Sequence, residues 1–190
     1  MKKQVKSVCR KRRIFLDTNV ILDFFLEREP FYYDALKLWA ACEEGLVEGY
    51  VSALTVNNVH YVAERLKSET TAMIAVRGIL GVFNVVPLDK ELMQRAADFH
   101  DRDFEDDIQL QSAIKAGCSH LFTRDLTHFH STAVAVVFCA VGRMRMPACP
   151  RCGMTSKRGF TPLHKVCSDC PTCGGRLGRR KRKLHELGDA

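Results

Sequence analysis

An apolar run that ends on an acid and continues directly into a helical pattern lies near the start of the chain. Its residues are Ile14-Phe15-Leu16-Asp17-Thr18-Asn19-Val20-Ile21-Leu22-Asp23. In open α/β folds, the carboxyl ends of strands and the amino ends of helices form a polar crevice where ligands bind. The run therefore predicts an α/β fold with Asp17 at such an edge, where it either binds a hard divalent cation or caps the following helix.

Segments with strand and helix character alternate along the next 120 or so residues. We expect strands at 14–16, 49–53, 83–88, 119–123 and 133–139, and helices at 20–28, 32–44, 55–66, 70–80, 90–99 and 106–116. This alternation predicts a parallel sheet covered by helices on both faces, a three-layer α/β/α domain. The apolar run 132–141 is about half of the roughly 20 residues that a membrane helix needs, so no membrane span is expected.

Charge divides the chain into an acidic body and two basic flanks. The first 13 residues contain seven Lys or Arg and no acid, and residues 142–190 contain twelve Lys or Arg and three acids. Residues 14–141 contain ten Lys or Arg against nineteen acids. Basic flanks can neutralise phosphates, so they favour a nucleic-acid partner, although a solubilising role explains them too. The N-terminus lacks the apolar stretch of a signal peptide, which predicts a cytoplasmic protein.

Three segments place acids where predicted strands end or helices begin. They are Asp17, the run Asp103-Phe104-Glu105-Asp106-Asp107, and Asp125 in Thr123-Arg124-Asp125. Each acid has a plain structural role available to it at a helix start or in a turn, but a parallel sheet gathers such ends at one edge. Clustered carboxylates repel unless a cation lies among them. A HAD-type phosphatase is disfavoured, because Asn19 stands where its second Asp is needed.

These segments, together with Val51-Ser52-Ala53-Leu54-Thr55, resemble the PIN-domain ribonucleases, and most closely their toxin-like branch related to VapC. The resemblance extends over roughly residues 13 to 140. It implies a five-stranded parallel sheet in the order 3-2-1-4-5, with Asp17 and Asp125 facing each other across the crevice between strands one and four. It also implies hydrolysis of RNA phosphodiester bonds with one or two bound Mg²⁺ or Mn²⁺ ions.

The resemblance assigns the metal-binding acids residue by residue. Asp17 corresponds to the first acid of the family, Asp106 to the third and Asp125 to the fourth. Asp107 and Glu105 lie near enough to assist, and the helical register can favour either.

The second acid of the family falls on Asn58, an amide where a carboxylate is usual. An amide can ligate a metal through its oxygen but adds no charge, so weaker metal binding is expected. Asn19 and Thr123 are expected to orient the acids by hydrogen bonds, while Glu64, further along the same helix as Asn58, reads as a solvent-facing residue.

The C-terminal region carries two copies of a Cys-x-x-Cys-Gly knuckle separated by 17 residues. This spacing predicts a small zinc-ribbon-like segment with four thiolates around Zn²⁺. The expected ligands are Cys149, Cys152, Cys170 and Cys173, with Cys167 or His164 as substitutes. An unfolded, out-of-frame extension is the competing interpretation. The expected organisation is a basic arm at 1–12, a PIN-like nuclease domain at 13–141, the zinc-ribbon-like segment at 142–178 and a basic tail at 179–190.

The leading hypothesis is a divalent-metal-dependent endoribonuclease, and the resemblance suggests that it is the toxin of a toxin–antitoxin pair. RNA is the expected substrate, and the resemblance adds an antitoxin protein and a homodimer as expected partners. An alternative is a PIN-fold module that binds RNA or protein without cutting, because Asn58 weakens the metal site. An endonuclease that processes ribosomal RNA is a further alternative, since some such enzymes join a PIN domain to a zinc ribbon. A DNA-directed nuclease or regulator is another hypothesis.

Overall fold

The computed structural model describes residues 11–99, 103–126, 129, 131 and 133–138, all within the first of two compact units, Met1–Met144. The expected zinc-ribbon-like segment, the basic tail and most of the basic arm fall outside these residues. Their predicted ligands therefore stay predictions, namely Cys149, Cys152, Cys167, Cys170, Cys173 and His164.

Five short strands form one parallel sheet in the order β3-β2-β1-β4-β5. The strands are β1 (Arg13–Leu16), β2 (Glu48–Ser52), β3 (Asn84–Val86), β4 (His120–Thr123) and β5 (Ala135–Phe138). The central strand β1 pairs with both neighbours, since Ile14 lies opposite Gly49 of β2 and His120 of β4. The predicted strand order is confirmed, and the direction of winding reverses between β1 and β4.

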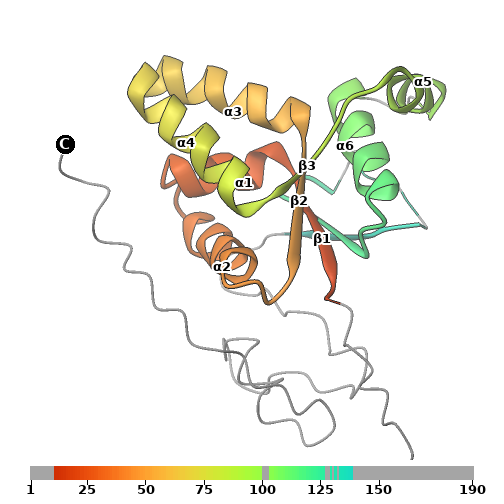
Figure 1. Ribbon diagram of the computed structural model, residues 1–190, viewed down its shortest axis with the longest axis horizontal. Helices are drawn as coiled ribbons and strands as arrows, with labels where there is room; N and C mark the ends of the chain where they lie inside the picture. The colour runs from red at the N-terminus through yellow and green to blue at the C-terminus, as the bar shows by residue number, and fades with distance from the viewer. Residues whose placement is uncertain (1–10, 100–102, 127–128, 130, 132, 139–190) are drawn as a thin grey trace, which may run out of the picture. The chain divides into compact units, whose positions relative to one another are not determined.

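Six helices cover the described part of the sheet. They are α1 (Thr18–Phe25), α2 (Tyr32–Glu43), α3 (Ala53–Leu66), α4 (Glu69–Val82), α5 (Lys90–Phe99) and α6 (Phe104–Lys115). Helices α1 to α4 lie on one side of the sheet, and α5 and α6 lie on the other (Figure 1). The three-layer α/β/α architecture is thus confirmed. Within the described residues, no helix has the length and apolar character needed to cross a membrane.

The central strand is buried on both of its faces. Phe15 packs in a core with Leu92, Leu110 and Leu121, which come from α5, α6 and β4. Its neighbours Ile14 and Leu16 are also buried, and strand alternation directs them to the opposite layer. Because β1 is packed on both sides, the position of the residue that follows it is closely fixed.

An aromatic cluster anchors α1 against its neighbours. The indole of Trp39 in α2 stacks on Phe24 with a centroid distance of 4.4 Å and meets Phe25 edge-on at 5.1 Å. Phe83, at the end of α4, approaches the same indole edge-on at 5.1 Å. These contacts add packing energy beyond simple burial and hold α1 in a single orientation.

Polar side chains cap the helices that start at the C-terminal edge of the sheet. The Ser52 hydroxyl accepts from the Thr55 amide at 3.0 Å, and Asp103 accepts from the Glu105 amide at 2.8 Å. Asp17 caps α1 directly, so this helix begins at Thr18, two residues before the predicted start at Val20. Capping groups satisfy amide donors that have no partner within the helix.

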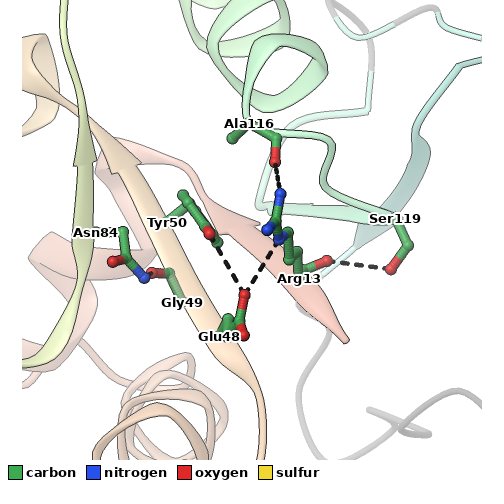
Figure 2. Close-up of polar contacts among 7 residues, drawn as sticks. All are labelled: Arg13, Glu48, Gly49, Tyr50, Asn84, Ala116 and Ser119. Carbon is green, nitrogen blue, oxygen red and sulfur yellow. Dashed lines mark hydrogen bonds and ion pairs between the residues drawn. The ribbon is translucent and has the colours of Figure 1, made fainter. Parts of the chain in front are cut away.

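At the opposite, N-terminal edge of the sheet, Arg13 ties three elements together (Figure 2). Its guanidinium donates to Glu48 of β2 at 3.1 Å and to the carbonyl of Ala116, just after α6, at 3.0 Å. Tyr50 also donates to Glu48, and Ser119 donates to the Arg13 carbonyl at 3.1 Å. We call Arg13, Glu48 and Tyr50 the Arg13 cluster; in it each charge faces an opposite charge or a polar group.

Candidate metal and catalytic site

Asp17 lies at the C-terminal end of β1 and is 2% exposed. One carboxylate oxygen accepts from the Thr18 amide at 2.6 Å, and the other accepts from the Thr123 hydroxyl at 3.0 Å. The Asp17 amide itself donates to the Phe122 carbonyl of β4 at 3.0 Å. The carboxylate is therefore held by the first amide of α1 and by a hydroxyl of β4, the strand that faces β1 across the reversal point of the sheet.

Thr123 links Asp17 to the turn that follows β4. Its hydroxyl oxygen donates to Asp17 and accepts from the backbone amide of Asp125 at 3.0 Å. Thr123 is fully buried, whereas Asp125 is partly exposed. A single hydroxyl thus fixes the spacing between the carboxylate of Asp17 and the backbone at Asp125.

The first turn of α6 brings two more acids close to Asp17. The pKa of Asp17 is raised from 3.8 to about 7, mainly by burial, with contributions from the negative charge of Asp106 and, to a smaller extent, that of Glu105. The hydrogen bonds from Thr123 and Thr18 lower this pKa but do not offset the other effects. The charged groups that act on Asp17 are thus acids, so the carboxylate is held in an environment that disfavours its charge.

Asn58 meets Glu105 across the gap between α3 and α6. The amide nitrogen of Asn58 donates to Oε1 of Glu105 at 2.8 Å. The Thr18 hydroxyl donates to the same oxygen at 3.2 Å. Asn58 is therefore turned toward an acid with its donor end, an orientation that the sequence did not predict.

A buried hydrogen-bond network lies beneath these acids. The Gln109 amide nitrogen donates to the hydroxyl of Thr18 at 2.7 Å and to that of Thr55 at 3.0 Å. Thr55 also lies 3.0 Å from the Ser52 hydroxyl, and all four residues are buried. The network joins the starts of α1 and α3 to α6.

Sequence reasoning missed this network. Gln109 lies three residues after Asp106, which places both on one face of α6. A Gln flanked by the apolar residues Ile108 and Leu110 was the available signal, together with the Ser52-x-x-Thr55 cap.

Arg124 connects the turn after β4 to α1. Its guanidinium lies 3.1 Å from the carboxylate of Asp23 and 4.8 Å from the ring centre of Phe31. Burial raises the pKa of Asp23 to about 6, while Arg124 and Arg28 lower it. The ion pair anchors the segment that carries Thr123 and Asp125.

The contacts described above gather Asp17, Asp106, Glu105, Asn58 and Thr123 in one region, and Asp125 joins it through its backbone. Of the other predicted residues, Asp107 is buried and Asn19 is partly exposed. Among the described residues, no three His, Cys, Asp or Glu side chains converge tightly enough to hold a metal ion as they stand.

The segment that contains these residues matches a known family. Residues 13–127 match the PIN domain, a range that runs from the start of β1 past the turn with Asp125. The chain belongs to the PIN-domain family. No curated protein matches the chain.

Solved structures share the fold of this PIN domain. VapC20 of Mycobacterium tuberculosis, described as a sarcin–ricin loop cleaving toxin, has a TM-score of 0.52 and 18% identity, covering 60% of this chain and 92% of its own. A toxin–antitoxin complex from Klebsiella pneumoniae has a TM-score of 0.52 and 21% identity, and the match covers 67% of this chain and 98% of the other. FitAcB from Neisseria gonorrhoeae has a TM-score of 0.51 and 20% identity, and the match covers 66% of this chain and 97% of the other. At these identities, the likeness establishes the fold, which this chain shares with VapC toxins.

Proposed function

We propose that this PIN domain is a divalent-metal-dependent endoribonuclease. The observation that carries the proposal is the setting of Asp17 at the C-terminal edge of the sheet. Its carboxylate is buried, its pKa is raised to about 7, and the charges of Asp106 and Glu105 contribute to that rise. Clustered acids in such a place lower the stability of the fold when no cation lies among them. Such a cost is typical of functional sites.

The residues present fit a hard divalent cation. The donor set consists of carboxylate, amide and hydroxyl oxygens, which Mg²⁺ and Mn²⁺ prefer over nitrogen and sulfur ligands. A cation placed among Asp17, Asp106 and Glu105 would offset the repulsion that raises the pKa of Asp17. Asp17, Asp106 and Asp125 are the proposed ligands, with Glu105 and Asp107 as the assisting acids and Asn58 at their side.

When bound, the ion supplies a polarised water and charge stabilisation for phosphodiester hydrolysis. The protein's own residues supply orientation. Thr123 and the Thr18 amide hold the two oxygens of Asp17, while Thr18 and Asn58 hold one oxygen of Glu105. Because these donors come from different elements, the acids are presented by a rigid frame. Asn19 remains a proposed orienting residue at the start of α1.

RNA is the proposed substrate, and an antitoxin and a second copy of the chain are the proposed partners. The basic segments at both ends of the sequence support a polyanionic substrate. The fold likeness to a VapC toxin and to toxin–antitoxin complexes supports the toxin assignment. The zinc-ribbon-like segment and the ribosomal-RNA processing alternative depend on cysteines outside the described residues, so both stay predictions.

A second candidate function is a module that binds RNA or protein without cutting. It is favoured by one observation, the neutral Asn58 whose donor end is occupied by Glu105. A site short of one carboxylate binds its metal more weakly and can lose catalysis while the fold persists.

Cleavage of a mixed RNA pool distinguishes the two functions. We would compare the full-length protein with its Asp17→Asn variant in Mn²⁺, in Mg²⁺ and in EDTA. The proposal predicts cleavage that needs the metal and falls by about a hundredfold or more in the variant, because the buried carboxylate is a metal ligand. Glu64→Gln is the matched control, since Glu64 is an exposed acid of α3 whose contact is a 3.8 Å pair with His60.

Equal activity of Asp17→Asn and the parent protein would refute the nuclease assignment. Inert proteins that still retain RNA, measured by gel shift with the same pool, would support the binding module instead.

A further inference from the structure

Asn58 and Glu105 occupy the α3 side of the acid cluster together, and their contact has a defined direction. The Asn58 side chain uses its NH₂ group to donate to Oε1 of Glu105 at 2.8 Å. An amide whose nitrogen faces a carboxylate has its oxygen at the far end of the same planar group. Asn58 is therefore placed as a hydrogen-bond donor to Glu105.

The carboxylate of Glu105 is fixed by donors from two other helices. Asn58 comes from α3, and the Thr18 hydroxyl, at 3.2 Å, comes from α1. Thr18 is itself held by the Gln109 amide at 2.7 Å. Both donors go to Oε1, which leaves Oε2 of Glu105 as the oxygen that these contacts do not engage.

The backbone at Glu105 is fixed as well, because its amide donates to Asp103 at 2.8 Å in the cap of α6. The charge of Glu105 reaches Asp17, where it contributes to the raised pKa. The α3 side of the cluster thus holds a carboxylate from α6, although α3 itself contributes only a neutral amide there.

We propose that Glu105 supplies the metal-binding carboxylate on the α3 side of the site and that Asn58 is a positioning residue that orients it. This inference rests on the proposed function, since it assigns ligands within the same metal site. It replaces the expectation that the Asn58 oxygen ligates the ion. Glu105 binds through the carboxylate oxygen that Asn58 and Thr18 leave open.

A double-mutant cycle on Mn²⁺ affinity tests the inference. Binding of Mn²⁺ to the full-length protein is measured from the electron paramagnetic resonance signal of the free ion. Because Mn²⁺ prefers oxygen ligands, the thiols of the cysteine-rich segment compete weakly for it. The proteins compared are the parent, Glu105→Gln, Asn58→Ala, the double variant Asn58→Ala/Glu105→Gln, and the control Glu64→Gln.

Glu105→Gln is expected to weaken Mn²⁺ binding about tenfold or more, because a charged ligand is lost. Asn58→Ala is expected to weaken it by about threefold to tenfold, as for other residues that orient a ligand. In the double variant, the Asn58 change should add nothing further, since Asn58 acts through Glu105. Independent, multiplying effects, or parent-like affinity in Glu105→Gln, would overturn the inference.

Thermal unfolding in EDTA separates ligation from a merely structural role. A metal ligand in a repulsive cluster costs stability without the ion, so Glu105→Gln should unfold no earlier than the parent protein. Earlier unfolding in EDTA together with unchanged Mn²⁺ affinity would assign Glu105 a structural role and overturn the inference. If Glu105→Gln does not fold, Mn²⁺ affinity is measured in Glu105→Asp instead. This variant keeps the carboxylate but places it one methylene further from the ion, so weaker binding is expected.

Asp17→Asn in the same titration distinguishes failure of this inference from failure of the proposed function. Loss of Mn²⁺ binding in Asp17→Asn, with parent-like binding in Glu105→Gln, would leave the metal site standing and remove Glu105 from it. If the parent protein does not bind Mn²⁺, both the proposed metal-dependent function and the role of Glu105 are refuted.

Discussion

At one edge of the sheet opposite charges are paired, and at the other edge like charges lie close together, although a single strand of four residues connects the two edges. At one end of β1, the guanidinium of Arg13 donates to Glu48 at 3.1 Å and to the carbonyl of Ala116, just after α6, at 3.0 Å. At the other end, the buried Asp17 is influenced by Asp106 and Glu105, both of the same sign as itself. Compensated charge holds elements together, whereas uncompensated charge costs stability and indicates a ligand site. The comparison separates the part of the sheet that stabilises the fold from the part that we assign to chemistry.

The largest expected effect is stabilisation of the acidic edge by metal. Mn²⁺ at a hundredfold excess over its dissociation constant should raise the free energy of unfolding by about 3 kcal/mol, because the ion binds only the folded protein. Asp17→Asn should lose most of this gain, and Arg13→Met should keep it. Differential scanning calorimetry with and without Mn²⁺ provides the measurement, and an equal gain in Asp17→Asn would contradict the assignment.

Asp17 should also lower stability as the pH rises, in the absence of metal. Its pKa is raised from 3.8 to about 7 in the folded protein, so between these values the folded state binds more protons than the unfolded state. Its stabilising effect is full below about pH 4 and is lost as the pH approaches 7. Relative to the parent protein, Asp17→Asn should therefore gain about 2–3 kcal/mol between pH 5 and pH 8.

Urea unfolding in EDTA at the two pH values measures this difference. A gain of the opposite sign, with the variant losing stability as the pH rises, would show that Asp17 has a favourable charge partner.

Gln109→Leu tests the frame beneath the acids. The substitution removes the donor that serves Thr18 at 2.7 Å and Thr55 at 3.0 Å, leaving buried hydroxyls short of a partner. We expect a loss of about 2 kcal/mol in the free energy of unfolding. Gln111→Leu, two residues along the same helix and partly exposed, is the control and should change stability by less than about 0.5 kcal/mol. Similar losses in both variants would count against a special role of the network.

The smallest effect is expected at the opposite edge. Arg13→Met removes the ion pair with Glu48 and the bond to the Ala116 carbonyl but keeps most of the apolar stem. Both side chains of the ion pair are about one-third exposed, so the loss should be about 1 kcal/mol. Mn²⁺ affinity should not change, and a tenfold change measured by titration would show that the two edges are not independent.

The sequence predicts the secondary structure that carries the site better than the hydrogen bonds within it. The parallel sheet and the place of Asp17 follow from alternating strands and helices, because parallel strands bring their carboxyl ends to one edge, whereas the strand order is implied by the family resemblance. The start of α1 at Thr18 is a local matter, and the cap by Asp17 explains the two-residue difference. Periodicity therefore places the elements along the chain, while the capping side chain decides the residue at which a helix begins.

Partners distant in the chain required the structure. Asn58 and Glu105 are 47 residues apart, and Gln109 and Thr18 are 91 apart. Which end of an amide faces its partner depends on how α1, α3 and α6 pack, and no spacing rule contains that information. The same holds for Arg13, which the sequence analysis counted only as part of a basic flank.

The most direct test of the metal assignment is a crystal structure of the protein soaked in Mn²⁺, with anomalous diffraction recorded at a wavelength where manganese scatters strongly. We predict an anomalous peak within ligand distance of carboxylate oxygens of Asp17 and Asp106, with Glu105 contributing its second oxygen. A peak that lies elsewhere, with Asp17 still hydrogen-bonded to Thr18 and Thr123 and no ion beside it, would refute the assignment of the metal site to these acids.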